Sequence, residues 1–196
     1  MRICFDMDGT ILDTLEDLTD SMNYALQEAG QPMRSIDEIR TFVGNGLRNL
    51  VHRAVAEGTS LEEEERIFKI HGAYYREHSN VKTKPYDGII DLLKQLKVQG
   101  YKLAVVSNKA DFAVKTLVEG YFPDVFDYAV GEKEGVKRKP APDTVFAVMN
   151  ELNKKGLLNT GCMTVTGRTI GENIEGCVNL DPEVIRTIDN HYSETG

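Results

Sequence analysis

Two aspartates, Asp6 and Asp8, stand one residue apart directly after the short apolar run at residues 3–5. Such a run is typical of a buried parallel strand, and open α/β sheets place their chemistry at the carboxyl ends of their strands. Gly9 follows and allows a tight turn that lets both carboxylates face one pocket. Such a pair can share a hard divalent cation, or one can attack as a nucleophile while the other transfers a proton. A plain strand-ending turn capped by Asp accounts equally well for the local pattern.

Residues 6–14 read Asp-Met-Asp-Gly-Thr-Ile-Leu-Asp-Thr. They resemble the Asp-x-Asp-Gly-Thr signature of the haloacid dehalogenase-like hydrolases and continue it as phosphoglycolate phosphatase-like members do. In that family the first Asp is the nucleophile that forms an aspartyl-phosphate, and the second is the general acid and base. The first carboxylate and the backbone carbonyl of the second residue bind Mg²⁺. The resemblance therefore implies these roles for Asp6 and Asp8, implies Mg²⁺ as the cofactor, and adds Thr10 as a substrate-binding residue.

Two later segments resemble further motifs of the same family. Residues 102–107 have the pattern of a buried strand that ends in polar residues, Ser107 and then Asn108. The family uses a hydroxyl and an amide at this point to bind the transferred phosphoryl group. Lys139 lies in a Lys-Pro-x-Pro run, and the resemblance implies that its ammonium pairs with Asp6 and the phosphoryl oxygens, as phosphoryl transfer requires. A Ser-Asn turn and a basic loop before a helix are also common without any such role.

Residues 15–81 carry helical spacing and no strand pattern. Ser35 and Ser60 each begin a capping-box sequence, and the helix after Ser60 is predicted to run to about residue 77. A block of helices between a first strand and a return to strand–helix alternation is similar to the helical cap of related phosphatases. We therefore predict an α/β fold, with a Rossmann-like core and parallel sheet built from residues 1–14 and 82–150, and an inserted all-helical cap at residues 15–81.

A glycine-bracketed loop lies inside this insert, at residues 44–46. Such a loop before a helix is a natural place for backbone N–H groups to meet an anion, and a plain helix–helix turn has the same pattern. It resembles the substrate-recognition loop of phosphoglycolate phosphatase-like caps, which implies that Gly44 and Asn45 contact substrate. Arg48 could reach a substrate carboxylate or lie on the surface. Three histidines lack ligand spacing and are interpreted as surface or partly packed residues: His52, His71 and His78.

Composition narrows the function classes. The chain has 196 residues, a net charge of −8 and a pI near 5.1, which argues against a nucleic-acid or anionic-membrane surface. No apolar run approaches the roughly 20 residues of a membrane span, and the N-terminus lacks the order of a signal peptide. The 3 cysteines indicate neither a disulfide framework nor a zinc site, so a cytoplasmic location is expected. The expected partner is a small phosphorylated metabolite, and the oligomeric state is left open.

The end of the chain departs from this family. After a helix predicted from residue 142 to about 154, the family has a strand ending in Gly-Asp-x-x-x-Asp, whose carboxylates complete the Mg²⁺ site. Here the strand-like residues 162–166 are followed by Gly167 and Arg168, and an arginine repels a metal ion. This fourth motif is therefore missing.

Residues from about 149 to 196 instead resemble an interior piece of dihydroxy-acid dehydratase, most clearly at residues 163–167 and at the closing residues 192–196. The piece does not include that family's iron–sulfur cysteines, so no dehydratase activity is inferred. We interpret residues 151–196 as an atypical C-terminal segment. Our hypothesis is that the chain is a chimera, joined near residues 147–152.

Replacing the end of the core has a structural consequence. It should leave the strand of Asp6 with an open edge, which invites aggregation or a borrowed partner. Alternatively, residues 160–166 alternate enough to serve as a replacement strand. Glu172 would then be the acid nearest to the metal.

Two functions from different classes follow from these patterns. The first is a Mg²⁺-dependent phosphatase that hydrolyses a small phosphomonoester, with phosphoglycolate as the leading candidate. The second is a catalytically impaired remnant that binds phosphate at most, and the missing fourth motif favours weak or absent turnover. A sugar-phosphate mutase is the alternative within the enzyme class, since similar caps serve sugar-phosphate isomerisation.

Overall fold

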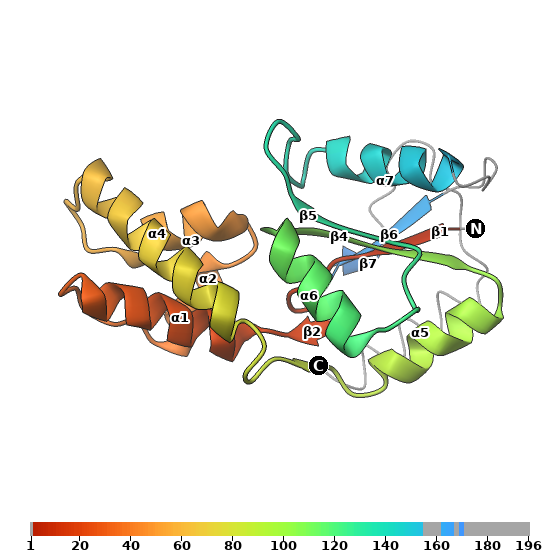
Figure 1. Cartoon of the computed structure of the whole chain (residues 1–196), viewed down its shortest axis with the longest axis horizontal. Helices are drawn as coiled ribbons and strands as arrows, with labels where there is room; N and C mark the ends of the chain where they lie inside the picture. The colour runs from red at the N-terminus through yellow and green to blue at the C-terminus, as the bar shows by residue number, and fades with distance from the viewer. Residues whose placement is uncertain (1, 155–161, 167–168, 171–196) are drawn as a thin grey trace.

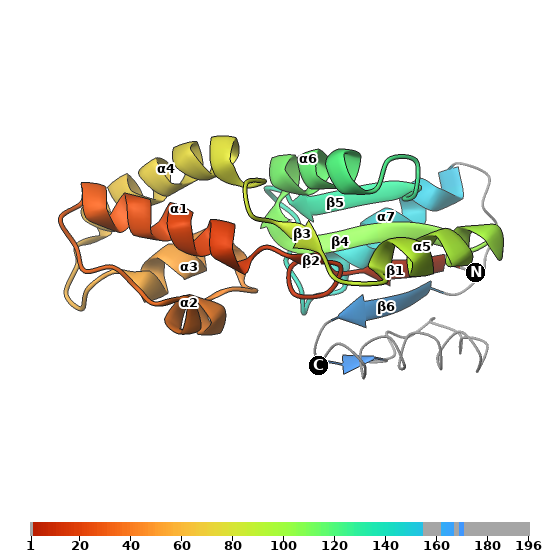
Figure 2. The same cartoon turned by 90° about the horizontal axis from the view of Figure 1, so that it is seen from below.

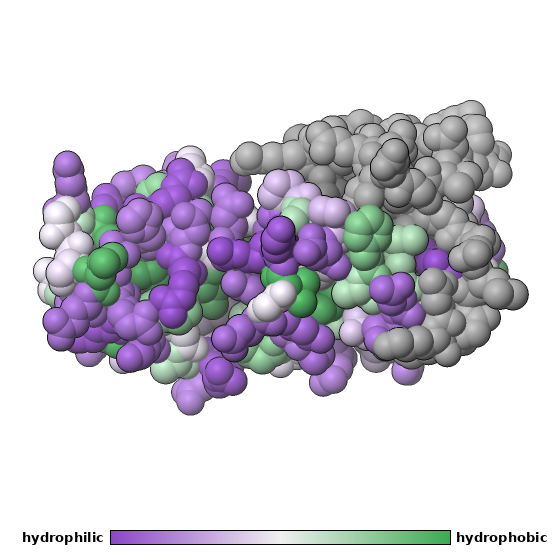
Figure 3. Space-filling model, turned by 90° about the horizontal axis from the view of Figure 1, so that it is seen from above, coloured by the Kyte–Doolittle hydropathy of each residue, from purple (hydrophilic) through white to green (hydrophobic). Residues whose placement is uncertain are grey.

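The computed structural model describes residues 2–154, 162–166 and 169–170. Figure 1 shows two units side by side, a bundle of helices and an α/β unit built on a sheet. We call the helices α1–α4 the cap, and the sheet with its helices α5–α7 the core. None of the described helices combines the length and the apolar composition that a membrane span needs. On the face shown in Figure 3, hydrophobic residues are visible only in small groups among hydrophilic ones.

The core sheet has the strand order β5-β4-β1-β6-β7. Strand β1 (Arg2–Phe5) is central and runs parallel to β4 (Lys102–Ala110) and to β6 (Cys162–Thr166). Strand β5 (Tyr128–Glu132) is parallel to β4, and the short β7 (Thr169–Ile170) is antiparallel to β6. Because these apolar runs form a parallel sheet, the carboxyl ends of β1 and β4 meet at one edge. This confirms the predicted α/β class.

Helices cover both faces of this sheet (Figure 2). Successive side chains of a strand point to opposite faces, so Ile3 and Phe5 of β1 pack with α5 (Ile89–Val98) and α6 (Asp111–Tyr121). Cys4 points the other way and packs with α7 (Asp143–Lys154). The strand that carries Asp6 is therefore buried on both faces.

The cap consists of α1 (Leu15–Glu28), α2 (Ile36–Phe42), α3 (Gly46–Ala54) and α4 (Leu61–His78). The predicted capping box at Ser35 is present in full, and the Ser60 side chain accepts a hydrogen bond from the Glu63 N–H at the start of α4. The apolar stripes of the four helices meet in one cluster that includes Met22, Ile39 and Ile67. The cap therefore has an apolar interior distinct from that of the sheet, and Ala113 of the core helix α6 joins it.

The two segments that connect the cap to the core lie next to each other and are held together by hydrogen bonds. Strand β2 (Leu12–Asp13) pairs antiparallel with β3 (Lys84–Pro85). The buried Asp17 carboxylate accepts hydrogen bonds from the backbone N–H groups of residues 81–83 and from the Thr83 hydroxyl, at 2.8–3.1 Å. A carboxylate that gathers four donors fixes the position of the returning chain against α1.

The expectation of an open edge beside β1 is wrong. Strand β6 pairs with β1 over four positions, from Arg2 opposite Cys162 to Phe5 opposite Val165. The alternation of residues 160–166 suits a strand, and pairing satisfies the backbone groups of β1 that would otherwise be exposed. Glu172 lies outside the described residues, so its relation to this edge stays a prediction.

Candidate active site

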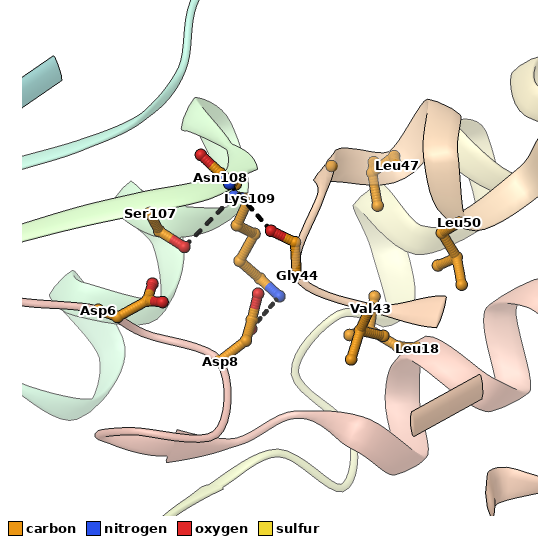
Figure 4. Close-up of a pocket in the computed structure, with 11 residues that line it drawn as sticks. Asp6, Asp8, Leu18, Val43, Gly44, Leu47, Leu50, Ser107, Asn108 and Lys109 are labelled. Carbon is orange, nitrogen blue, oxygen red and sulfur yellow. Dashed lines mark hydrogen bonds and ion pairs between the residues drawn. The ribbon is translucent and has the colours of Figure 1, made fainter. Parts of the chain in front are cut away.

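A pocket lies between the carboxyl ends of β1 and β4 on one side and the cap on the other (Figure 4). It is lined by Asp6, Asp8, Leu18, Val43, Gly44, Gly46, Leu47, Leu50, Ser107, Asn108 and Lys109. Both aspartates, together with Ser107 and Asn108 near the end of β4, therefore face the same space. The pocket lies at the edge of the sheet where parallel α/β folds place their ligands.

A tight turn after β1 positions the two aspartates. The Met7 carbonyl accepts hydrogen bonds from the N–H groups of Thr10, Ile11 and Leu12 at 3.1–3.2 Å, which folds the chain into a tight loop. Gly9 adopts a φ of +71°, a conformation that a residue with a side chain rarely takes. The Met7 side chain is fully buried, while those of Asp6 and Asp8 on either side of it line the pocket.

Asp6 is paired with the lysine that the family resemblance indicated. The Lys139 Nζ lies 2.8 Å from Asp6 Oδ1 and also donates to the Val106 carbonyl at 2.8 Å. The Met7 N–H donates to the same carboxylate oxygen, again at 2.8 Å. Both contacts involve Oδ1, which leaves Oδ2 of Asp6 available to a metal ion or a phosphorus atom.

Asp8 has a lysine partner of its own, Lys109, which sequence reasoning missed. The Lys109 Nζ donates to Asp8 Oδ1 at 2.7 Å, and the side chain of Lys109 is only 1% exposed. Burial lowers the pKa of Lys109, but the Asp8 carboxylate and Tyr75 outweigh it and raise that pKa above its usual value. The sequence did contain a signal for this contact. Lys109 comes directly after Ser107 and Asn108, near the end of β4, and β4 is the neighbour of the strand that precedes the two aspartates.

Asn108 is already engaged by other parts of the chain. Its Nδ2 donates to the Gly44 carbonyl at 2.9 Å and to the Lys139 carbonyl at 3.1 Å, and its Oδ1 accepts from the Lys139 N–H at 2.9 Å. An amide has two donor hydrogens, and both are used. Asn108 therefore links the cap loop to the loop that carries Lys139. This arrangement does not support the predicted contact between Asn108 and the phosphoryl group. Ser107 lines the pocket, where its Oγ accepts from the Lys109 N–H at 3.3 Å.

The cap loop rests directly on the core. Gly44 lines the pocket, while the Asn45 carbonyl accepts a hydrogen bond from the Arg138 guanidinium at 2.8 Å. Gly46 has a φ of +80°, and a Cβ there would collide with the Arg138 guanidinium and lie 2.9 Å from Glu132 Oε2. Only glycine allows this close approach.

Three residues predicted to contact substrate do not line this pocket. Thr10 is fully buried beneath the turn, with its N–H held by the Met7 carbonyl. The exposed Asn45 meets Arg138 instead. Arg48 pairs with Glu65 at 2.7 Å and stacks on the Phe68 ring at 4.2 Å, in a separate hollow between α3 and α4. Adjacent helix positions point about 100° apart, so Arg48 turns away where its neighbour Leu47 faces the pocket.

The interpretation of His71 as a surface or partly packed residue is wrong. Its ring is fully buried in α4 and stacks on Tyr75, with centroids 5.7 Å apart. Burial, with a smaller contribution from the nearby Lys109 ammonium, lowers the pKa of His71 to about 4. His71 is therefore neutral at physiological pH. By contrast, the exposed His52 lies 3.1 Å from Glu64, as expected of a surface residue.

The described residues supply part of a magnesium site. Asp6 and Asp8 provide the carboxylate and carbonyl oxygens that Mg²⁺ prefers, and Oδ2 of Asp6 is not used by Lys139 or Met7. No group of three His, Cys, Asp or Glu side chains with metal-binding geometry occurs in residues 2–154, 162–166 and 169–170. The donor types therefore fit Mg²⁺, with fewer acids than a closed site would have.

The family model for haloacid dehalogenase-like hydrolases matches residues 3–157. The chain therefore belongs to this family. It is 33% identical over 153 residues to phosphoglycolate phosphatase 1 of Pseudomonas aeruginosa, covering 75% of this chain and 56% of that protein. Its fold is similar to that of a structure from Lactobacillus delbrueckii subsp. bulgaricus provisionally named phosphoglycolate phosphatase. That comparison has a TM-score of 0.74 and 33% identity, and covers 98% of this chain and 82% of the other.

A second similarity concerns another family. A stretch of 52 residues, 26% of this chain, is 69% identical to dihydroxy-acid dehydratase from Lachnoclostridium phytofermentans and covers 9% of that enzyme. The predicted resemblance to two families is confirmed, and it supports the interpretation of the chain as a chimera. The chain also spans less than two thirds of the Pseudomonas protein and of a phosphoglycolate phosphatase from Thiobacillus denitrificans, at 56% and 64% of their lengths.

Proposed function

We propose that this chain is a phosphatase that hydrolyses a small phosphomonoester through an aspartyl-phosphate on Asp6, with Mg²⁺ as its cofactor. The observation that carries the proposal is the pair of aspartates at the end of β1, each held by its own lysine at one pocket. Paired carboxylates with separate partners can take separate roles in one reaction. Phosphoglycolate is the first candidate substrate, because it is the substrate named for the relatives.

The proposed reaction has two steps. In the first, Asp6 attacks phosphorus in line, the bond from phosphorus to the leaving oxygen breaks, and Asp8 donates a proton to that oxygen. In the second, Asp8 takes a proton from a water molecule that attacks the aspartyl-phosphate, which releases inorganic phosphate and restores Asp6. Lys139 offsets the charge that gathers on the phosphoryl oxygens, and Ser107 donates a hydrogen bond to them.

Mg²⁺, held by the Asp6 carboxylate and the Asp8 backbone carbonyl, would supply further positive charge to the phosphoryl group. Because the described residues offer no third acid near this pair, we expect magnesium to bind weakly. Turnover should then be slow and should rise with Mg²⁺ concentration well beyond the level that saturates a complete site.

The division of labour between the two units is part of the proposal. Residues 1–14 and 82–150 form the core that carries the reacting groups, and residues 15–81 form the cap that closes over the substrate. Gly44 and its loop reach the pocket from the cap side. Substrate size would therefore be set by the cap.

The test is the release of inorganic phosphate from phosphoglycolate and from p-nitrophenyl phosphate by the full chain, with and without Mg²⁺. We expect turnover that needs Mg²⁺ and that falls by at least about 10⁴-fold in Asp6→Asn, because the nucleophile is removed. A folded but inactive chain would overturn the proposal. Calorimetric binding of inorganic phosphate by that inactive chain would then favour the non-catalytic function, which the incomplete acid set supports.

A further inference from the structure

We propose that Lys109 is a positioning residue that holds Asp8 in the orientation needed for proton transfer to the leaving group. The inference rests on the proposed phosphatase function and adds to it the element that directs the acid and base. Its basis is the set of contacts around the Lys109 ammonium at the end of β4 (Figure 4).

The burial of Lys109 keeps its ammonium almost entirely away from solvent. A lysine is almost never fully buried unless it is paired, and the Lys109 side chain is 1% exposed. Its Nζ lies 2.7 Å from Asp8 Oδ1, on a carboxylate that is itself 22% exposed. Asp8 therefore keeps access to the pocket, while Lys109 lines the same pocket with almost no exposure to solvent.

The contacts around Asp8 are asymmetric, and this asymmetry directs the carboxylate. The Thr14 hydroxyl donates to Asp8 Oδ1 at 2.7 Å, and Lys109 donates to the same oxygen at 2.7 Å. Two donors on one oxygen, one from the start of α1 and one from β4, fix the rotation of the carboxylate. Oδ2 is then the oxygen left to carry the proton that the reaction moves.

The two lysines at the pocket serve different acids. Lys139 contacts Asp6 and the Val106 carbonyl, whereas Lys109 contacts Asp8. The Lys109 Nζ also lies over the Tyr75 ring of α4, 5.1 Å from its centroid. The ammonium that contacts Asp8 therefore also contacts a side chain of the cap, whereas the ammonium of Lys139 contacts groups of the core.

If Lys109 orients Asp8, its loss should affect two substrates differently, which a general loss of stability would not do. An alkyl phosphomonoester needs a proton on its leaving oxygen, whereas p-nitrophenolate leaves without one. The ratio kcat/KM reports only the steps up to departure of the leaving group, so the later attack of water does not enter it. A residue that aims Asp8 should therefore matter for phosphoglycolate and hardly at all for p-nitrophenyl phosphate.

The experiment compares Lys109→Met with Lys139→Met on both substrates. For Lys109→Met we expect kcat/KM to fall about 10²-fold on phosphoglycolate and less than about 3-fold on p-nitrophenyl phosphate, given the usual size of general acid catalysis. Lys139→Met should slow both substrates alike, because Lys139 faces the phosphoryl group. The control is Lys115→Met, which removes an exposed lysine that pairs with Asp111 on α6 and should change neither rate.

An equal loss on both substrates, or no loss on phosphoglycolate, would overturn the proposal for Lys109. If Lys109→Met does not fold, Thr14→Val removes the other donor to Asp8 Oδ1 and should produce the same selective loss. If the wild-type chain is inactive, the phosphatase proposal fails by itself, and crystal structures of the wild type and Thr14→Val still decide the positioning role. We expect one Asp8 rotamer in the wild type and a turned carboxylate in the variant, and an unchanged carboxylate would contradict the inference.

Discussion

The two walls of the pocket are chemically unlike. The core wall is entirely polar and comprises Asp6, Asp8, Ser107, Asn108 and Lys109, whereas the cap wall is apolar or glycine and comprises Leu18, Val43, Gly44, Gly46, Leu47 and Leu50. The core wall comes from the ends of two adjacent strands, and the cap wall comes from helices α1 and α3 and the loop between α2 and α3. Charge is therefore concentrated where the backbone is most firmly held.

The contrast has a physical cause. Strand ends in a buried parallel sheet are fixed by pairing on both sides, so a carboxylate and an ammonium there can be held at hydrogen-bond distance. Leu18 and Leu50 of the cap wall are also members of the cap's own apolar cluster. The cap wall is thus the pocket-facing side of a packed interior. It has no charged side chain, so it can limit the size and shape of a substrate but cannot pair with its charges. We therefore expect that reaction chemistry and substrate size can be altered separately in this fold.

The largest effect should come from Lys139, which does not line the pocket itself but pairs with Asp6 of the core wall. Lys139→Met removes the ammonium beside Asp6, and we expect kcat to fall about 10²- to 10³-fold, the usual cost of losing one donor that stabilises the transition state. Steady-state kinetics on phosphoglycolate would measure it. The matched control is Lys137→Met, because Lys137 is an exposed lysine in the same basic run. If both variants lowered kcat equally, the loss would come from the change in overall charge. It would then give no evidence that Lys139 acts on the reacting groups.

A second prediction tests the interior behind the cap wall. The folded chain holds His71 with a pKa lowered to about 4, while in the unfolded chain it returns to its ordinary value of 6.5. Between these values only the unfolded chain binds the proton, so the free energy of unfolding should drop as the pH falls through this window. The loss attributable to His71 is about 3 kcal/mol at most.

Urea unfolding of the wild type and His71→Phe at about pH 7.5 and pH 4.5 would measure this dependence. Phe keeps the ring beside Tyr75 and cannot bind a proton, so the variant should lose less stability on acidification than the wild type. Equal losses in the two proteins would show that His71 does not titrate as its burial requires.

Local patterns predicted much of the fold and part of the site. The strands of Asp6 and Ser107 and the capping box at Ser35 depend on residues close together in sequence, and these elements form as expected. The ion pair of Lys139 with Asp6 came from the family resemblance and is present. The family assignment is confirmed over residues 3–157.

What the sequence did not predict depends on contacts between distant segments. Lys109 meets Asp8 across 101 positions, and Asn108 meets Gly44 across 64. No periodicity encodes either contact. His71 has the sequence surroundings of a surface residue, and its burial follows only from the packing of α4 against α1 and the core. The catalytic roles of the site residues stay predictions until they are tested by activity.

A substitution of Asn108, which links the cap loop to the core, should have a moderate effect on substrate binding. Asn108→Asp keeps the oxygen that accepts from the Lys139 N–H, but it replaces the two donors with an oxygen that faces the carbonyls of Gly44 and Lys139. Losing one such contact costs about 1–3 kcal/mol, so we expect KM to rise roughly 10-fold as the cap loop loosens. A large fall in kcat with an unchanged KM would instead assign Asn108 to the phosphoryl group, as the family resemblance implied.

The smallest effect should come from the cap wall, where Leu47→Ala removes apolar volume and no charge. We expect kcat/KM for phosphoglycolate to fall only a few-fold, because a small substrate covers about one methylene equivalent of the Leu47 side chain and each buried methylene contributes about 0.8 kcal/mol. A bulkier phosphomonoester such as glycerol 3-phosphate should gain relative to phosphoglycolate, because the widened wall admits it. Leu61→Ala is the control, since Leu61 is 83% exposed at the start of α4 and does not line this pocket. A loss in Leu47→Ala as large as that in Lys139→Met would mean that the cap wall positions the reacting groups, and chemistry and shape would then not be separable in this pocket.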